Sequence, residues 1–344
     1  MTRVLLVCHE ELVPPLSIEG LSDEEISDFR AEFDVRSALE ELGYEVGVLG
    51  IPDDIDRLRE GIEEFRPDVC FNLTVEFHGA AEYDANVTAL FELLRQPYTG
   101  CNPRGQMLAR DKELSKKVLA YDGVPIPKFH RFERGKRVKK PAHLEYPLFV
   151  KSATEEASLG ISVASIVRDD AALRERCEFF FEEIESDALV EEYVEGREFY
   201  VGVLGNKTLK TWPVWELVIN NLPKNHPLIA TRRVKWDVAY QKKIGIKNQR
   251  AQGLSQKTER ELARIAKATY RSLGLSGYAR LDLRMRPNGR IYVLEANPNP
   301  DITYGEDFAE SAEAAGVEYP ELIRRIVRLG RNYPALWKER AAAR

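Results

Sequence analysis

Short apolar runs alternate with amphipathic runs over roughly the first hundred residues, and this alternation limits the possible folds more than any other feature of the chain. In chain order the runs are Arg3–Cys8, Phe33–Leu42, Glu45–Leu49, Ile55–Phe65, Asp68–Leu73 and Asp84–Leu94. Strands that alternate with helices form a parallel sheet, because each helix covers the sheet while it returns the chain to the next strand. The chain is therefore predicted to begin with a Rossmann-like α/β unit.

The segment PYTGCNPRG at residues 97–105 marks the end of this unit, because Pro, Gly and Asn favour turns. A helical pattern follows at DKELSKKVLAYDG, and a second one covers Thr258–Leu273. The remaining strand-like runs are short: Lys128–Phe132, Pro147–Lys151, Ile161–Val167, Ala188–Tyr193, Glu198–Leu204, Thr208–Val214, Ala279–Met285 and Arg290–Glu295. We predict α+β units here, with domains at residues 1–100, 101–187 and 188–335.

Residues 220–254 are polar, basic and weakly periodic. Long segments of this kind in compact proteins are often lids or binding loops, and a surface excursion without function is the alternative. We predict a mobile loop at these positions.

The composition argues against two classes of partner. A net charge of -6 and a pI near 5.7 do not suit a protein held to nucleic acid or to an anionic membrane mainly by charge. No apolar stretch approaches the length of a membrane span, and MTRVLLVCHEEL turns acidic too early for a secretory signal. The cysteines lie far apart without CxxC spacing, which favours reduced thiols: Cys8, Cys70, Cys101 and Cys177. We expect a cytoplasmic protein.

The most informative motif is a hairpin towards the C-terminus, in which RLDL and YVLEANP flank a PNGR turn. Strand alternation places Arg280 and Asp282 on one face, and it places Glu295 and Asn297 on one face of the partner strand. Two carboxylates and an amide oxygen suit Mg²⁺ that bridges phosphates, and an arginine offsets charge on a phosphoryl group. A solvated hairpin is the alternative, but the apolar IYVL run indicates a buried strand, where charges need partners.

Two other segments have the groups of a nucleotide site. Lys151 ends the apolar run LFVK, from which its ammonium can reach phosphates, and Ser158 lies in the Ser/Gly loop that follows at 152–160. The stretch LVEEYVEGRE at 189–198 can offer backbone groups to an adenine edge and a carboxylate to ribose. Taken singly, an edge strand with a surface lysine and an acidic turn are the simpler interpretations.

The order of the segments carries more information than any one of them. DK at 111–112, VK with its Ser/Gly loop, EEYVEGRE, RLDL and LEANPNP follow one another. This succession closely resembles that of the ATP-grasp superfamily, and the residues within the motifs are similar to those of the D-alanine:D-alanine ligase branch. The resemblance implies an ATP-grasp fold, ATP with Mg²⁺ or Mn²⁺, small-molecule carboxylate and amine substrates of amino-acid or peptide-like type, and a homodimer.

The same resemblance implies roles for single residues. Lys112 and Lys151 match phosphate-binding lysines, and Ser158 matches a serine of the closing loop. Arg280 matches the arginine that stabilises the acyl phosphate and the tetrahedral intermediate, and Lys235 matches a lysine of the mobile loop. The adenine and ribose contacts fall on Glu191, Tyr193, Val194 and Glu198, and the metal ligands on Asp282, Glu295 and Asn297. In HGAAE the weaker substrate-side candidates are His78 and Glu82, with a surface histidine as the alternative.

The chain departs from the family pattern at the substrate end. After the EAN motif it reads PNPDITYGED, without the carboxylate-binding serine. Asp301, Glu306 and Asp307 repel a carboxylate and attract an amine or a guanidinium. The glycine-rich N-terminal loop that presents a glutamate to the donor is replaced by HEELVPPLSIEG.

Three functions compete on these grounds. The first is a ligase of altered specificity, in which ATP phosphorylates a carboxylate and an amine then displaces phosphate from the acyl phosphate. The second is a genuine D-alanine:D-alanine ligase. The third is a nucleotide-binding regulatory module, although binding without chemistry has little need of Arg280. We predict the first.

Overall fold

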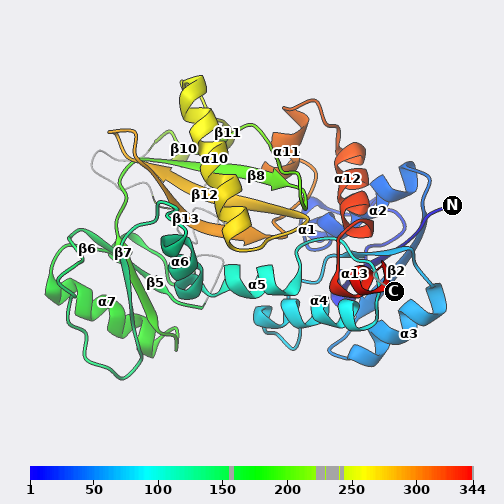
Figure 1. Cartoon of the computed structure of the whole chain (residues 1–344), viewed down its shortest axis with the longest axis horizontal. Coiled ribbons are helices and arrows are strands. Elements are labelled where there is room, and N and C mark those ends of the chain that lie inside the picture. The colour runs from blue at the N-terminus through cyan, green and yellow to red at the C-terminus, as the bar shows by residue number, and fades with distance from the viewer. Residues whose placement is uncertain (155–158, 222–228, 230–239, 241–243, 343–344) are drawn as a thin grey trace.

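The computed structural model describes residues 1–154, 159–221, 229, 240 and 244–342 (Figure 1). Its N-terminal part contains a parallel three-stranded sheet of order β2-β1-β3, formed by β1 (Arg3–His9), β2 (Glu45–Ile51) and β3 (Val69–Asn72). β1 is almost wholly buried, as expected for a central parallel strand with helices around it. The predicted Rossmann-like start is confirmed.

The helices of this part are α1 (Asp23–Ser27), α2 (Arg30–Glu41), α3 (Ile55–Phe65) and α4 (Asp84–Leu93). Ser22 caps α1 in a capping box with Glu25, and Asp54 caps α3 by accepting from the backbone N–H of Asp56. Short 3₁₀ turns lie at Glu10–Leu12 and Ala81–Tyr83. Local capping signals therefore decide where α1 and α3 begin.

A smaller antiparallel sheet has the order β4-β7-β5-β6, and its strands are β4 (Phe129–Phe132), β5 (Leu148–Ser152), β6 (Ile166–Val167) and β7 (Ala188–Glu192). α7 (Asp170–Glu182) covers it, while α5 (Pro103–Arg110) and α6 (Lys112–Tyr121) lead into it from the N-terminal part (Figure 1). The predicted strand at Ile161–Val167 is wrong for most of its length, because Val163–Ser165 form a 3₁₀ turn closed by the Ser162 and Ser165 side chains.

The largest sheet has the order β11-β10-β8-β12-β13, with β9 paired to β8. Its strands are β8 (Arg197–Leu204), β9 (Lys210–Thr211), β10 (Trp215–Ile219), β11 (Ile246–Arg250), β12 (Tyr278–Met285) and β13 (Ile291–Pro298). α10 (Gln256–Ser272) lies across one face. Two predictions need correction: the strand at Thr208–Val214 shrinks to β9, and β11 falls inside the loop predicted at 220–254. Pairing with β10 makes β11 a strand although its own sequence, IKNQR, is polar.

The C-terminal helices are α11 (Asp307–Glu313), α12 (Tyr319–Arg331) and α13 (Leu336–Ala342). The apolar face of α12 joins that of α2 and strands β1 and β3 in one buried core (Figure 1). The chain therefore ends against the sheet with which it began. No helix of the described residues is long and apolar enough to cross a membrane.

Candidate active site

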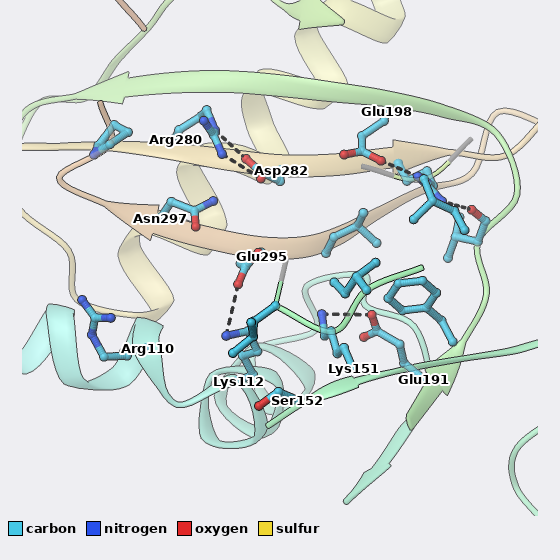
Figure 2. Close-up of a pocket in the computed structure, with 18 of the residues that line it drawn as sticks. Arg110, Lys112, Lys151, Ser152, Glu191, Glu198, Arg280, Asp282, Glu295 and Asn297 are labelled. Atoms are coloured by element: carbon cyan, nitrogen blue, oxygen red, sulfur yellow. Dashed lines mark hydrogen bonds and ion pairs between the residues drawn. The ribbon is translucent and has the colours of Figure 1, made fainter. Parts of the chain in front are cut away.

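One cavity of about 600 Å³ lies between the small sheet and the β12-β13 hairpin of the large sheet (Figure 2). Its walls carry the described residues that the sequence singled out for nucleotide and metal binding: Lys112, Lys151, Glu191, Tyr193, Val194, Glu198, Arg280, Asp282, Glu295 and Asn297. Residues far apart in sequence thus meet around one space, because lysines of α6 and β5 face carboxylates of β12 and β13.

The hairpin forms as the alternation predicts. In the β12-β13 register Arg280 lies opposite Asn297 and Asp282 opposite Glu295, with a bulge directly after Asp282. Arg280 donates to both carboxylate oxygens of Asp282, with Nε 2.8 Å from Oδ1 and Nη2 3.1 Å from Oδ2. Burial disfavours the charged guanidinium, but the Asp282 carboxylate outweighs it and raises the pKa of Arg280. The arginine stays charged in the cavity wall.

The oxygen donors of the hairpin fit a hard divalent cation. Asp282 and Glu295 supply carboxylates and Asn297 an amide, and the Asn297 Nδ2 is buried without a hydrogen-bond partner among the described residues. No group of three or more His, Cys, Asp or Glu side chains converges on a metal position in the part of the chain that the structure describes. Two carboxylates and one amide oxygen suit Mg²⁺, because this ion takes few protein ligands and completes its shell with phosphate oxygens and water.

Three buried lysines lie on the opposite side, and two of them, Lys112 and Lys151, line the cavity. Lys112 Nζ lies 3.6 Å from Glu295 Oε1 across the cavity. Glu191 is held by two lysines, with Lys151 Nζ 3.1 Å from Oε1 and Lys116 Nζ 2.7 Å from Oε2. Burial raises the pKa of the Glu191 carboxyl, but the charges of Lys116 and Lys151 outweigh it and bring the pKa below its usual value. Sequence reasoning missed Lys116, although it lies one helical turn beyond Lys112 on the same face.

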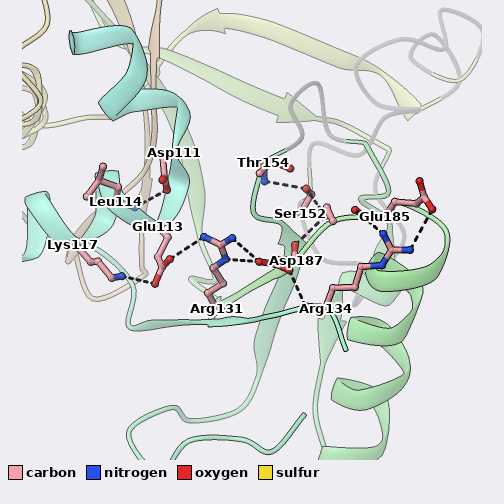
Figure 3. Close-up of polar contacts among 11 residues, drawn as sticks. Asp111, Glu113, Leu114, Lys117, Arg131, Arg134, Ser152, Thr154, Glu185 and Asp187 are labelled. Carbon is pink, nitrogen blue, oxygen red and sulfur yellow. Dashed lines mark hydrogen bonds and ion pairs between the residues drawn. The ribbon is translucent and has the colours of Figure 1, made fainter. Parts of the chain in front are cut away.

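Ion pairs hold α6, which carries two of these lysines, against the small sheet (Figure 3). Arg131 on β4 lies 3.2 Å from Glu113 Oε2 through Nη1 and 2.5 Å from Asp187 Oδ2 through Nη2. Lys117 Nζ lies 2.7 Å from Glu113 Oε1. The Arg131 contacts fasten α6 to the small sheet, whereas the exposed Lys117 pairs with Glu113 within the helix itself.

The hinge between β7 and β8 forms the end of the cavity beyond Glu191. Arg284 pairs with Glu198 and donates through Nη1 to the Val194 carbonyl at 3.2 Å, and its guanidinium lies 5.5 Å from the Tyr193 ring centroid. Gly196 (φ +143°) lets the hinge reach the hairpin, since a Cβ there would come within 1.9 Å of the Met285 carbonyl. Arg284 was missed, although the alternation that aligns Arg280 with Asp282 extends to it.

At the other end, acidic groups from both ends of the chain meet. Asp301 lines the cavity, and Asp307 accepts a hydrogen bond from Asn248 Nδ2 at 3.1 Å. Burial raises the pKa of Asp307 to about 6, although the Arg280 charge lowers it. From α2, Asp34 Oδ2 accepts from the Tyr304 backbone N–H at 3.1 Å. Burial, and to a smaller degree the Asp301 charge, raise the pKa of neighbouring Glu32 to about 7. The sequence offered no signal for these two α2 residues.

Arg110 also lines the cavity without having been foreseen. Its Nη2 lies 2.5 Å from Oδ2 of Asp84, a buried carboxylate at the start of α4. This contact ties the N-terminal part of the chain to the cavity wall.

Four predicted residues do not appear in this wall. Ser158 and Lys235 lie outside the described residues. His78 is exposed at a turn with φ 53°, where its backbone N–H donates to Asp53. Glu82 is exposed as well. Neither His78 nor Glu82 lines the described cavity, which favours the surface interpretation of this segment.

Known proteins share both the sequence and the fold. Residues 118–328, more than half of the chain, match the family model described as D-ala D-ala ligase C-terminus. A D-alanine–D-alanine ligase from Desulforudis audaxviator is 29% identical over 327 residues, covering 91% of this chain and 96% of that protein. An uncharacterized protein, y4sG, from Sinorhizobium fredii is 30% identical over 298 residues, covering 85% of each.

The D-alanine–D-alanine ligase from Bacillus anthracis, in a crystal structure complexed with ATP, has the same fold. Its TM-score is 0.72 at 22% identity, and the match covers 96% of this chain and 97% of that chain. The ATP-grasp fold expected from the motif order is therefore confirmed. By the family match and the full-length relatives, this chain belongs to the D-alanine–D-alanine ligase family of ATP-dependent ligases that form carbon–nitrogen bonds.

Proposed function

We propose that the protein joins a small-molecule carboxylate to an amine through an acyl phosphate, with ATP converted to ADP. This proposal rests on one observation: two walls with complementary groups face each other across one cavity. One wall supplies Lys112 and Lys151, and the other supplies Arg280 beside three oxygen donors: Asp282, Glu295 and Asn297. Lysines attract phosphates, while Arg280 stabilises the negative charge that develops when the amine attacks the acyl carbon.

The residues of this chain divide the work by position. Tyr193 and Val194 lie beside the adenine, Glu198 accepts from ribose hydroxyls, and Lys112 and Lys151 bind phosphates. Mg²⁺ or Mn²⁺, held by Asp282, Glu295 and Asn297, would offset charge on the transferred phosphoryl group. The γ-phosphoryl group passes to the donor carboxylate, the amine attacks the acyl carbon, and phosphate departs as the amine loses a proton.

The acceptor is proposed to be an amine that lacks a neighbouring carboxylate. Arg280 already lies between the Asp282 carboxylate, which it binds at both ends, and the charge of Asp307. A substrate carboxylate would have to compete with both for this cation. Asp301 in the cavity wall would repel it further, whereas it attracts a cationic amine.

The ligase proposal is tested by substrate-dependent turnover of ATP. Purified protein is incubated with ATP and Mg²⁺, and release of ADP and phosphate is followed with D- and L-amino acids singly and in pairs, with products identified by mass spectrometry. A substrate-dependent amide product is expected. Tight ATP binding with no stimulation by any carboxylate and amine pair would instead favour a regulatory nucleotide-binding module.

The acceptor proposal is tested with matched amines. D-Alanine, D-alaninamide and a short diamine are compared at one donor concentration. We expect the amide and the diamine to stimulate ADP release more than D-alanine does. A D-alanine dipeptide as the sole product would contradict the altered acceptor and would make the chain a genuine D-alanine–D-alanine ligase, as relatives such as that from Desulforudis audaxviator are named. The homodimer and the cytoplasmic location stay predictions.

A further inference from the structure

Three charged side chains at the nucleotide end form one buried network. Glu191 takes Lys151 on Oε1 and Lys116 on Oε2, at 3.1 and 2.7 Å. The exposed fractions of Lys116, Lys151 and Glu191 are 3%, 8% and 4%. They belong to α6, β5 and β7, so the network joins three elements of the cavity wall. Water is too scarce there to screen the charges.

The charges of this network do not cancel. Two ammonium groups and one carboxylate leave one positive charge, and Lys116 Nζ also lies 3.3 Å from the Leu294 carbonyl of β13. Burial lowers the pKa of Lys116, and the charge of Glu191 counters it. Lys151 lines the cavity, whereas Lys116 is not among the lining residues. The excess charge therefore reaches the cavity through Lys151.

We infer that Lys116 is a positioning residue of the nucleotide site. By holding one oxygen of Glu191, it prevents that carboxylate from neutralising Lys151, whose ammonium stays available to the nucleotide phosphates. The inference rests on the nucleotide site of the proposed function but not on its substrates. Each carboxylate oxygen accepts more than one hydrogen bond, so Glu191 can serve the adenine amino group as well.

Removal of Lys116 changes the charge of the network from +1 to 0, because Glu191 then pairs with Lys151 alone. Lys116→Met combined with Glu191→Gln restores +1, since Lys151 remains and both other charges are gone. Glu191→Gln alone gives +2. The attraction for phosphates should follow this charge, and the contacts to the nucleoside should not.

The test measures dissociation constants of ATP, ADP and adenosine for the full chain by calorimetry, with competition for the weakest ligand. The quantity compared is the ratio of adenosine to ATP dissociation constants, because it cancels general losses in the adenine pocket. Lys116→Met should lower this ratio about tenfold. The loss of affinity for ADP should lie between the losses for ATP and for adenosine. The double variant and Lys116→Arg should stay within about threefold of the wild type.

Lys117→Met is the matched control. Lys117 is the next residue on α6, its side chain is 59% exposed, and it pairs with Glu113 instead of Glu191. Its ratio should equal that of the wild type. An equal loss of affinity for all three ligands in Lys116→Met would overturn the inference, because a purely structural lysine lowers them together.

Folding and function are separated within the same series. If Lys116→Met shows no cooperative unfolding transition, the double variant decides, because it leaves no unmatched carboxylate. A tenfold lower ratio in a folded double variant would overturn the inference. A wild type that binds no ATP would contradict the proposed function and this inference together, whereas ATP binding with an unchanged ratio in Lys116→Met contradicts the inference alone.

Discussion

Charged side chains are paired with opposite charges at one end of the cavity and clustered with like charges at the other. At the nucleotide end, buried cations and anions contact one another directly: Lys116 and Lys151 with Glu191, Arg284 with Glu198, and Arg280 with Asp282. At the proposed acceptor end, which Asp301 lines, burial and to a smaller degree the charge of Asp301 raise the pKa of Glu32 and Glu306. The nucleotide end is arranged before its ligand arrives. The acceptor end has an electrostatic demand that a cationic ligand would satisfy.

This difference follows from what each end binds in the proposed reaction. A polyphosphate needs positive groups fixed in advance, because reorganising them in a low-dielectric cavity is costly. A cationic amine is attracted by clustered carboxylates, and its charge offsets the repulsion among them. Single substitutions at each end of the cavity test this difference.

Asp282→Ala or Glu295→Ala should reduce ADP release at least about a thousandfold, because a metal that bridges phosphates loses a ligand. A chelator should have the same effect on the wild type, and added Mg²⁺ should reverse it. Glu60→Ala, at an exposed position of α3, is the control and should leave turnover unchanged. Normal turnover by either cavity variant would refute the metal assignment.

Arg284→Met should destabilise the fold by about 3–5 kcal/mol, because it leaves the Glu198 carboxylate buried and unmatched. Combining it with Glu198→Gln should recover most of the loss. Urea unfolding measures both effects. Arg325→Met interrupts a partly exposed pair with Glu321 and should cost less than about 1 kcal/mol. Equal losses for the two arginines would remove the distinction drawn for the nucleotide end.

Glu32→Gln should stabilise the protein at pH 8 and not at pH 4. Burial raises the pKa of Glu32 from 4.5 to about 7, so the folded state binds its proton more tightly than the unfolded state does. This stability is complete below pH 4.5 and is lost as the pH rises to 7. The loss amounts to about 3 kcal/mol, which Gln avoids. Unfolding curves at both pH values measure it, and Glu41→Gln, exposed on the same helix, should show no such dependence.

Asp307→Asn should shift acceptor preference about tenfold from cationic amines towards amino acids, because Arg280 loses a competing carboxylate. The measurement is the ratio of kcat/KM for D-alaninamide and D-alanine. Glu313→Gln, at the exposed far end of α11, should not change this ratio. An unchanged ratio in Asp307→Asn would place the acceptor elsewhere.

Local patterns predicted much of the fold. α3 begins and ends at the predicted residues Ile55 and Phe65, and the β12-β13 hairpin forms at the predicted PNGR turn, with Asp282 opposite Glu295. Both depend on neighbours in sequence: caps, periodicity and a tight turn. β11 was missed because its sequence is polar and only β10 makes it a strand, which is a tertiary override of local propensity.

The candidate nucleotide contacts could be predicted from local patterns, because alternation in strands and helical periodicity decide the face on which Lys112, Arg280 or Glu295 lies. The partners of the buried charges depend on tertiary packing. Arg284 meets Glu198 across 86 positions of the chain, and Asp34 meets Tyr304 across 270. No local period encodes such contacts, because they form when separate sheets and helices pack together and buried charges must find whichever group the fold brings within reach.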